Sequence, residues 1–321
     1  MMVVDRNNGT IVDSNFNQLP NYLRAGDVLV INDTRVMRAR MFGVLERTNG
    51  SSRPIELLFV EPVSTCCWKV LCKPGRRVRP GDRVILEKGA GIGLFGEAAE
   101  QGLHQLTVES SVMSSVVDLL ANFGQVPLPP YLERNSTESD SAEYQTIFAK
   151  KVGAIAAPTA GLHFTPTILN SMTQRGVHVV PITLNVGIGT FLPIRTVDPR
   201  KHVLRPEWFS ISTESAQHLN KARESGRRII GVGTTSARTL EHLCQSGGEF
   251  QATSGYADMY ILPGHKFGAV DCLLTNFHLP RSTLLMLVSA FATRELILKA
   301  YARAIGARYR FYSYGDCMLV L

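Results

Sequence analysis

The sequence contains no hydrophobic run long enough to cross a membrane and no stretch typical of a secretory signal. Its longest apolar run, residues 284–292, is well short of the roughly 20 residues that a spanning helix requires. The N-terminus, MMVVDRNNGTIVDSN, has no apolar core behind a positively charged start. We therefore expect a cytoplasmic protein with no membrane partner.

Cysteine is also scarce, at 6 among 321 residues. A chain of this length can bury enough apolar surface without disulfides, so we expect reduced thiols. A zinc site at Cys66, Cys67 and Cys72 is the alternative. If residues 65–73 form a strand, Cys66 and Cys72 lie about 20 Å apart, at about 3.3 Å per residue, which is too far to share an ion. We expect buried thiols and no metal.

The sequence has no internal repeat and no low-complexity tract. Hydrophobic residues make up 45% and charged residues 19% of the chain, which excludes disordered and fibrous classes. The 321 residues suit two domains of about 100–200 residues each. Acidic residues are outnumbered by basic ones, 27 against 34, and the formal net charge of +7 favours an anionic partner.

Three catalytic motifs are missing as well. There is no G-x-x-x-x-G-K-[ST] loop, no G-x-S-x-G elbow and no H-E-x-x-H pair, so kinase, serine hydrolase and zinc protease classes lack support. Gly187 with Gly189, and Gly231 with Gly233, each form a G-x-G without the third glycine of a dinucleotide-binding motif. Each fits a tight strand-to-helix turn as well as a turn whose amides bind an anionic ligand.

Short β-rich runs do fill the region from about residue 36 to residue 108, separated by turn signals such as Lys-Pro-Gly and Arg-Pro-Gly. Many short strands at this spacing predict a small antiparallel barrel or sandwich. A helix is expected over residues 111–123, with Ser110 or Ser111 as its N-cap and Gly124 after its end. The expected strands are residues 40–46, 54–61, 66–73, 83–87, 92–98 and 103–108.

The remainder of the chain has an α/β pattern. Residues 27–32, DVLVIN, predict a buried strand, and residues 282–292 carry the apolar stripe of a core-facing helix. Between these two segments we expect strands at 154–157, 177–186 and 228–232 and helices at 166–175 and 214–225.

The simplest account of this order is a β domain inserted into an α/β domain. We expect residues 1–40 plus 126–321 to form an α/β catalytic domain, either barrel-like or an open sheet. Residues 41–125 are expected to form the inserted small antiparallel β-barrel domain.

Polar stretches follow several predicted strands, at the place where α/β sheets bind their ligands. His163 and His278 each lie in a turn bounded by glycine or proline beside a helix start, from which an imidazole can reach a ligand. A capping or surface role is the alternative for both. Asp316 could be a general base, an acceptor for a ribose hydroxyl or only a turn residue. We expect structural roles for His104, His178, His218 and His242.

Positive charge is concentrated in three clusters. Phosphates are contacted by cations, and unstacked bases stack on aromatic or guanidinium planes. A solvated surface is the alternative for any single cluster, but three in one basic chain favour RNA or DNA. The clusters are Lys73, Arg76, Arg77, Arg79 and Arg83; Arg35, Arg38 and Arg40; and Arg303, Arg308 and Arg310.

Six stretches together resemble one family. They are INDTRV at 31–36, APTAGLHFT at 157–165, VGIGTF at 186–191, VGTTSARTLE at 232–241, TNFHLPRSTLLMLVSAF at 275–291 and YRFYSYGDCML at 309–319. In this order they are similar to the S-adenosylmethionine:tRNA ribosyltransferase-isomerase family of queuosine biosynthesis. The resemblance runs from about Asp5 to the C-terminus.

The resemblance implies a fold and a reaction. Family members have an α/β domain with an inserted β-barrel domain. They transfer and isomerise the ribosyl group of S-adenosylmethionine onto 7-aminomethyl-7-deazaguanine in the tRNA anticodon, which gives epoxyqueuosine-tRNA and releases adenine and methionine. The partner is then a tRNA anticodon stem-loop and S-adenosylmethionine is a co-substrate. We expect no prosthetic group, no metal and a monomer.

Under this resemblance, His163 and His278 are expected to act as acid, base or leaving-group partners, with Asp316 as the next candidate. The tRNA-binding residues are expected to be Arg76, Arg77, Arg79, Arg308 and Arg310. The residues expected to hold substrate are Asn32, Asp33, Thr34, Arg35, Pro158, Thr159, Gly161, Gly187, Gly189, Thr190, Gly233, Thr234, Thr235, Arg238, Asn276, Arg281, Ser282 and Tyr314.

Three departures from the family pattern leave alternatives open. Members usually have a further segment ahead of the position that matches Val3, and this sequence does not contain it. Asn185 and Arg205 stand where the family usually has histidine, and neither can shuttle a proton near neutral pH. Two further hypotheses are therefore a catalytically impaired tRNA-binding relative and another S-adenosylmethionine- or nucleotide-dependent RNA-modifying enzyme.

Overall fold

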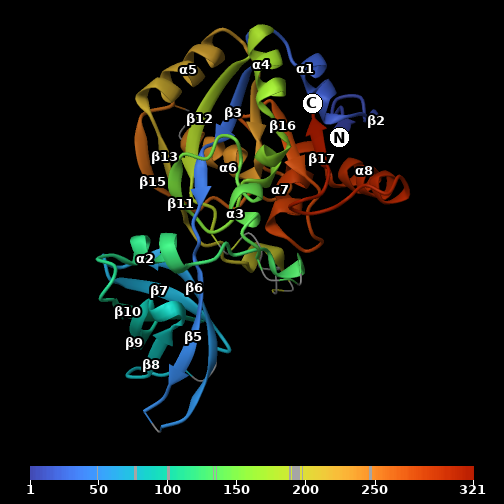
Figure 1. The fold of residues 1–321 in the computed structure, drawn as a ribbon. Coiled ribbons are helices and arrows are strands. Elements are labelled where there is room, and N and C mark those ends of the chain that lie inside the picture. The colour runs from blue at the N-terminus through green and yellow to red at the C-terminus, as the bar shows by residue number, and fades with distance from the viewer. Residues whose placement is uncertain are drawn as a thin grey trace. The chain divides into compact units, whose positions relative to one another are not determined.

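The structure is a computed structural model that describes residues 1–48, 50–75, 78–99, 102–132, 134, 136–187, 189, 196, 198–245 and 248–321. The chain divides into two units, drawn in Figure 1. One consists of Val36–Tyr144, and the other of Met1–Arg35 together with Gln145–Leu321. Residues 126–144, which the sequence pattern assigns to the α/β domain, group with the first of these units.

The first unit contains a closed antiparallel barrel with the strand order β10-β7-β6-β5-β8-β9. We refer to it as the barrel unit. Its strands are β5 (Arg40–Glu46), β6 (Ser52–Pro62), β7 (Cys67–Lys73), β8 (Arg83–Leu86), β9 (Gly91–Ala98) and β10 (Leu103–Glu109). The barrel confirms the expected inserted β-barrel.

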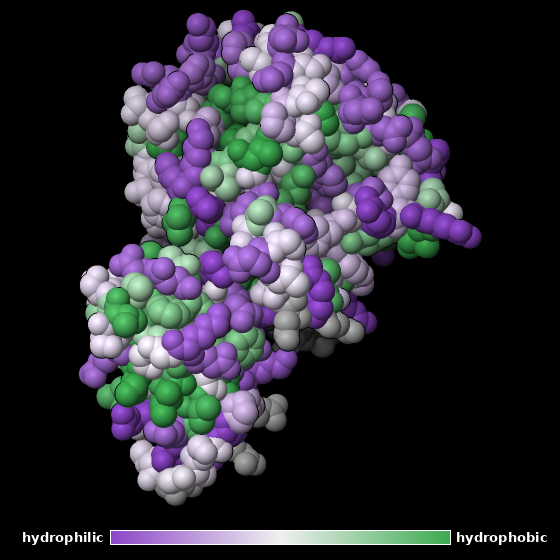
Figure 2. Space-filling view, viewed as in Figure 1, coloured by the Kyte–Doolittle hydropathy of each residue, from purple (hydrophilic) through white to green (hydrophobic). Residues whose placement is uncertain are grey.

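Alternating side chains build the barrel core. In β8, Val84 and Leu86 are buried whereas Arg83 and Ile85 are exposed, because successive side chains of a strand point to opposite faces. The outer face also carries apolar residues. Ile85 lies opposite Val44 on β5 and opposite Ile92 on β9, and all three are exposed. Figure 2 shows hydrophobic residues at the surface of this unit.

Helix α2 (Val116–Phe123) begins later than the sequence pattern indicates. Its N-cap is Ser115, whose side chain accepts a hydrogen bond from the amide of Asp118, so the expected caps Ser110 and Ser111 are wrong. The hydroxyl of Ser110 instead accepts hydrogen bonds from the amides of Val112 and Met113, which forms a separate turn. Gly124 follows the helix as expected.

The cysteines of the barrel unit lie where the strand argument places them. Trp68 and Val70 are buried on the inner face of β7, and Cys72 packs against the same core from that face. Cys66, Cys67 and Cys72 are half-buried rather than buried, and all six cysteines of the chain are unpaired. Burial raises the pKa of the Cys72 thiol to about 12, so this thiol stays protonated.

The second unit, which we call the α/β unit, is built on a nine-stranded sheet with the order β15-β13-β12-β3-β14-β16-β17-β1-β2. The sheet has two free ends, so of the two expected architectures it is the open sheet. Its strands are β1 (Met2–Val4), β2 (Ile11–Asp13), β3 (Val28–Asn32), β12 (His178–Leu184), β13 (Glu207–Ile211), β14 (Ile229–Val232), β15 (Thr253–Ala257), β16 (Cys272–Asn276) and β17 (Cys317–Val320).

Four central strands, β12, β3, β14 and β16, run parallel to one another. Strand β13 is antiparallel to β12, and β17 is antiparallel to β16. A separate two-stranded sheet pairs β4 (Thr34–Val36) with β11 (Lys151–Ala154). The bounds predicted for this strand, 154–157, are wrong, because β11 ends at Ala154. Beyond it, the amide of Ile155 donates a hydrogen bond to the carbonyl of Val186.

Helices cover both faces of the sheet, which explains why its central strands are apolar throughout. Val28 and Val30 of β3 face one core and Leu29 and Ile31 face the other. The helices are α1 (Leu19–Tyr22), α4 (Pro166–Gln174), α5 (Thr213–Glu224), α6 (Gly233–Cys244), α7 (Thr283–Ala292) and α8 (Arg294–Gly306), with the short α3 (Asp140–Glu143) in the barrel unit. Among the described residues, no helix is long and apolar enough to span a membrane.

The carboxyl ends of the parallel strands place the polar segments at one edge of the sheet. Strand β3 is followed by Asp33, β12 by Asn185, and β14 by Gly233, while β16 ends at Asn276. Because β17 runs antiparallel to β16, Asp316 just before it lies at the same edge. This edge is where ligands bind in open α/β sheets, so the fold brings the sequence motifs together.

Candidate active site

Helix α6 begins at the end of β14 and forms one wall of the candidate site. Gly233 has a φ of +85°, which glycine adopts without strain. An added Cβ there would lie 3.3 Å from Oγ1 of Thr235, so the space above Gly233 is taken by that hydroxyl. The N-cap residue Val232 has no acceptor in its side chain. The first-turn amides have no partner within the helix, and the positive end of its dipole lies here.

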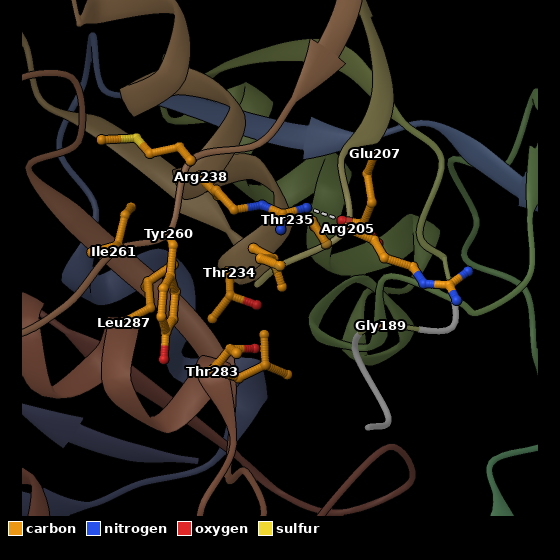
Figure 3. A pocket seen from close by; sticks show the side chains of 13 residues that line it. Gly189, Arg205, Glu207, Thr234, Thr235, Arg238, Tyr260, Ile261, Thr283 and Leu287 are labelled. Carbon is orange, nitrogen blue, oxygen red and sulfur yellow. Dashed lines mark ion pairs between the residues drawn. The ribbon is translucent and has the colours of Figure 1, made fainter. Parts of the chain in front are cut away.

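A cavity of about 460 Å³ opens at this end of α6 (Figure 3). The polar lining residues are Arg205, Glu207, Thr234, Thr235, Arg238, Tyr260 and Thr283. The rest of the lining consists of Gly189, Leu204, Met259, Ile261, Leu284 and Leu287.

A buried ion pair crosses the cavity wall. Arg238 of α6 pairs with Oε2 of Glu207, the first residue of β13 (Figure 3). The other oxygen, Oε1, accepts a hydrogen bond of 2.6 Å from the amide of Gly187. Burial lowers the pKa of Arg238 to about 10, so the guanidinium remains charged at neutral pH. Glu207 thus fixes both α6 and the segment after β12.

Two hydroxyl groups in the cavity lining are buried and lack partners. Oγ1 of Thr235 and the phenol oxygen of Tyr260 make no hydrogen bond to any residue that the structure describes. Burial of the phenol raises the pKa of Tyr260, so it stays neutral and can donate a hydrogen bond. Buried polar groups are ordinarily paired, so these two mark positions for ligand atoms or water.

A second polar group lies at the same edge of the sheet, around Asn276. We call it the Asn276 cluster, and it consists of His163, Asn276, Arg310, Tyr312 and Asp316. The side-chain amide of Asn276 donates a 3.0 Å hydrogen bond to the carbonyl of Tyr312, a residue held at a φ of +73°. Asp316 accepts a 2.7 Å hydrogen bond from the amide of Arg310. A bulky side chain at positive φ is strained, and such strain gathers at functional sites.

His163 is neutral at physiological pH. Burial lowers its pKa to about 4, assisted by the charged N-terminus and opposed by Asp316 and the side chain of Asn276. Its ring lies against Phe16, with 5.2 Å between ring centroids. Nε2 of His163 and Oδ1 of Asn276 make no well-oriented hydrogen bond within the described part of the chain.

His278 is neutral as well, because burial lowers its pKa to about 4. Its Nε2 lies 2.7 Å from Oγ1 of Thr275, and its backbone amide donates a hydrogen bond to the hydroxyl of Tyr301. His278 is therefore more constrained than His163. Neither histidine lines the cavity among the described residues, and Asp316 does not either.

The expected binding residues after β3 use their polar groups within the protein. Nδ2 of Asn32 donates a hydrogen bond to the carbonyl of Leu184, and Oδ1 of Asn32 accepts one from the amide of the same residue. Oδ1 of Asp33 accepts a 2.6 Å hydrogen bond from the hydroxyl of Thr183. Oγ1 of Thr34 donates a 2.9 Å hydrogen bond to Asn185. All three side chains are buried. We call this group of hydrogen bonds the β3 corner.

Several other expected substrate residues have local structural roles. Ser282 is the N-cap of α7, because its hydroxyl accepts a hydrogen bond from the amide of Leu285. Gly161 leaves room for Thr146, whose Cγ2 would lie 2.8 Å from an added Cβ. Pro158 and Thr159 belong to the turn that ends at His163. Arg281 is exposed at a φ of +56°, and Arg35 and Tyr314 are exposed.

The cationic clusters divide into paired and exposed members. Arg38 donates to the carbonyl of Gly124, Arg40 pairs with Glu56, and Arg303 pairs with Asp13. Arg79 and Arg308 are exposed, and so is Arg310, whose distance to Asp316 is 3.8 Å. The expected residues Arg76, Arg77 and Thr190 lie outside the described residues.

The two departures from the family pattern have different settings. Asn185 belongs to the β3 corner and packs on Gly153, where an added Cβ would lie 2.3 Å from Nδ2 of Asn185. Arg205 lines the cavity and extends toward Gly189 (Figure 3). Tyr260 and Thr283 also line it, and neither these two residues nor the role of Glu207 was predicted from the sequence. The available signal was that Glu207 lies on the same strand face as the apolar Phe209 and Ile211.

The structure offers no grouping of metal ligands. Among the described residues, no three His, Cys, Asp or Glu side chains lie close enough to hold an ion.

Comparisons with known proteins cover the whole chain. A family model described as "Queuosine biosynthesis protein" matches residues 1–320. A protein of Symbiobacterium thermophilum named S-adenosylmethionine:tRNA ribosyltransferase-isomerase is 44% identical over 321 residues, which cover 100% of this chain and 92% of that protein. One of the same name from Syntrophotalea carbinolica is 45% identical, with the same shares covered.

A solved structure agrees with these relatives. The crystal structure of S-adenosylmethionine tRNA ribosyltransferase from Thermotoga maritima matches with a TM-score of 0.54 and 31% identity, and covers 100% of this chain and 91% of that one. The resemblance seen in the six sequence stretches is thereby confirmed. The chain belongs to the S-adenosylmethionine:tRNA ribosyltransferase-isomerase family of queuosine biosynthesis.

Proposed function

We propose that this protein transfers and isomerises the ribosyl group of S-adenosylmethionine onto 7-aminomethyl-7-deazaguanine in tRNA, giving epoxyqueuosine-tRNA, adenine and methionine. The observation that carries the proposal is the cavity at the start of α6. Its lining includes residues of the 232–241 and 275–291 stretches, and it combines charged, hydroxyl and apolar side chains, as sites for small substrates do. The names of the relatives support the same reaction.

The reaction requires a base close to the ribose of S-adenosylmethionine. The sulfonium acidifies the C5′ hydrogens, so a neutral imidazole can remove one of them. His163 fits this role better than His278, because Nε2 of His278 already faces Thr275. The turn that carries His163 packs against the start of α6, since Ala160 lies 3.7 Å from the position of an added Cβ on Gly233.

The same imidazole can also serve the leaving group. Once it has accepted the C5′ proton, a histidine whose pKa is about 4 is a strong acid. It can then protonate adenine, which departs with the electron pair of its bond to C1′. Methionine departs with the electron pair of the C5′–S bond. The aminomethyl nitrogen of the tRNA base forms the new bond to the ribosyl group and loses one of its protons to solvent. Asp316 remains the next candidate for proton transfer.

The tRNA is expected to contact exposed cations. Arg308 and Arg310 lie at the C-terminal end of the α/β unit, and Arg79 lies in the barrel unit. Arg76 and Arg77 lie outside the described residues, and they are included in this proposal on the sequence alone. Arginine side chains bind phosphates and stack on unpaired bases, as an anticodon loop requires.

The setting of the reaction follows from its substrates. A tRNA-modifying enzyme with six unpaired cysteines fits the reducing cytoplasm. S-adenosylmethionine is consumed as a co-substrate, and the proposed chemistry uses no prosthetic group. The expected monomer stays a prediction.

The test is to incubate the protein with S-adenosylmethionine and tRNA that carries the aminomethyl base. Adenine release that depends on this tRNA is the expected result. Binding of the tRNA without adenine release would favour a catalytically impaired relative, and transfer of a methyl group would favour another S-adenosylmethionine-dependent enzyme. His163→Gln is expected to lower the rate of adenine release at least about 100-fold, the lower range for loss of a general base.

A further inference from the structure

The cavity at the start of α6 contains an unsatisfied donor beside a positive helix end. Thr235 is only 9% exposed, and its hydroxyl makes no hydrogen bond within the described part of the chain. The hydroxyl lies over Gly233, next to the amides of the first turn of a 12-residue helix. Donors and a helix dipole that converge in this way favour a small anionic group.

A carboxylate lies in the same cavity wall. Glu207 is 7% exposed, with one oxygen bonded to the amide of Gly187 and the other paired with Arg238. A carboxylate has about four lone-pair positions, so Glu207 retains capacity to accept further hydrogen bonds. Arg238 neutralises Glu207 and Arg205 adds a positive charge to the lining, so the lining attracts an anion, and the remaining lone pairs of Glu207 attract an ammonium group attached to that anion.

Another part of the lining is apolar. Met259, Ile261 and Leu287 line the cavity together with Leu204 and Leu284. A ligand that fills the cavity therefore has a hydrocarbon or thioether portion next to its charged groups.

We infer that this cavity binds the amino-acid end of S-adenosylmethionine. Its carboxylate lies at the first turn of α6 and accepts a hydrogen bond from the hydroxyl of Thr235. Its ammonium donates to Glu207, and its methylene chain packs on Met259, Ile261 and Leu287. This inference rests on the proposed function, and it assigns the part of the co-substrate that the cavity holds.

Other parts of the substrates fit the same groups less well. A tRNA phosphodiester would bring a negative charge to the helix end, but it has no hydrogen-bond donor for the remaining lone pairs of Glu207. Adenine is neutral and would leave the helix end without a partner. The zwitterionic amino-acid end satisfies both charges at once, because its carboxylate and ammonium are attached to the same carbon.

Titration calorimetry without tRNA tests the assignment with three compounds. S-adenosylmethionine has the complete amino-acid end, decarboxylated S-adenosylmethionine lacks the carboxylate, and 5′-methylthioadenosine lacks both charged groups. We expect the wild-type protein to bind S-adenosylmethionine at least about ten-fold more tightly than the decarboxylated compound, the effect of a hydrogen bond to a charged group. The thioadenosine should bind still more weakly.

Two valine variants separate the ligand contact from a general effect on α6. Thr235→Val removes the hydroxyl in the cavity with little change in shape, and we expect it to weaken S-adenosylmethionine about ten-fold and the decarboxylated compound much less. Thr239→Val is the matched control, since its hydroxyl bonds to the carbonyl of Thr235 on the same helix and lies outside the cavity lining. It should leave all three affinities unchanged.

The outcomes distinguish this inference from the proposed function. A wild-type protein that releases adenine with tRNA but binds S-adenosylmethionine and its decarboxylated form equally would overturn the inference alone. Equal weakening of both compounds by Thr235→Val would also overturn it. A protein that binds none of the three compounds and releases no adenine would contradict the proposed function itself. The comparison of compounds on the wild-type protein stands even where a variant fails to fold.

Discussion

Two polar groups lie at the carboxyl ends of neighbouring strands of the same sheet, and they use their polar atoms in opposite ways. In the β3 corner, Asn32 is bonded on both amide atoms and Asp33 and Thr34 have protein partners. In the cavity after β14, Thr235 and Tyr260 keep buried hydroxyls without a partner in the described chain.

This difference shows that a residue at the ligand-binding edge of the sheet does not contact a ligand merely because of its position. Asn32, Asp33 and Thr34 in one group and Thr235 in the other are small polar residues after an apolar strand, and all four are buried. Buried polar atoms are ordinarily paired, so the two cavity hydroxyls without a partner among the described residues mark positions for a ligand or water. The β3 corner is therefore expected to contribute stability, and the cavity is expected to contribute binding.

The largest expected effect concerns the β3 corner. Asn32→Ala would leave the amide and carbonyl of Leu184 without their partner in a buried place. We expect it to lower the free energy of unfolding of the α/β unit by about 2–4 kcal/mol. Urea denaturation of the variant and the wild type measures the change.

Arg35→Ala provides the control, because this neighbouring side chain is exposed. It should change the free energy of unfolding by less than about 0.5 kcal/mol. The comparison fails if Asn32→Ala keeps wild-type stability and instead weakens binding of S-adenosylmethionine.

A pH dependence follows from the two buried histidines. Burial lowers the pKa of both His163 and His278 from 6.5 to about 4, so the unfolded chain takes up protons first as the pH falls. Their contribution to the free energy of unfolding is complete above pH 6.5 and is lost as the pH falls toward 4. Each histidine should cost about 2 kcal/mol of stability between pH 7 and pH 5.

His163→Gln isolates one half of this effect. The variant should lose about 2 kcal/mol less than the wild type over the same pH interval, because glutamine does not titrate. Denaturation at pH 7 and pH 5 gives the difference. An unchanged pH dependence would show that His163 takes up its proton equally easily in the folded protein.

A smaller effect is expected for the exposed cations of the tRNA proposal. Arg308→Ala and Arg310→Ala should each reduce tRNA affinity a few-fold at about 0.1 M salt and lower the slope of log affinity against log salt by about 1. Filter binding over a series of salt concentrations measures both. Arg303→Ala is the matched control on the preceding helix, because Arg303 is engaged by Asp13. A slope unchanged by Arg308→Ala would remove that residue from the tRNA surface.

Much of the fold could be predicted from the sequence, because local patterns determine it. The strand at 40–46 coincides with β5 (Arg40–Glu46), since alternation and flanking turns are encoded within a few residues. The position of the motifs at one sheet edge also follows from strand order in any parallel sheet. The start of α2 was missed because several serines in 110–115 can act as caps, and only the structure shows which one faces the helix.

The site could be predicted only in part, for a different reason. Thr234, Thr235 and Arg238 follow a strand and were found from the motif, whereas Tyr260 and Glu207 reach the cavity through the antiparallel pairing of β13 and β15. That pairing joins segments about 50 residues apart and has no local signal. The bonds of Asn32, Asp33 and Thr34 could not be predicted from the sequence either, because their partners lie on β12 or directly after it.

Kinetics of Thr235→Val test the central claim most directly, namely that the unpaired hydroxyl of the cavity binds S-adenosylmethionine. Adenine release is measured with saturating tRNA over a range of S-adenosylmethionine concentrations, alongside the unfolding midpoint. We predict a KM for S-adenosylmethionine raised about ten-fold, a kcat close to that of the wild type and an unfolding midpoint unchanged. An unchanged KM in a stably folded Thr235→Val variant would contradict the account.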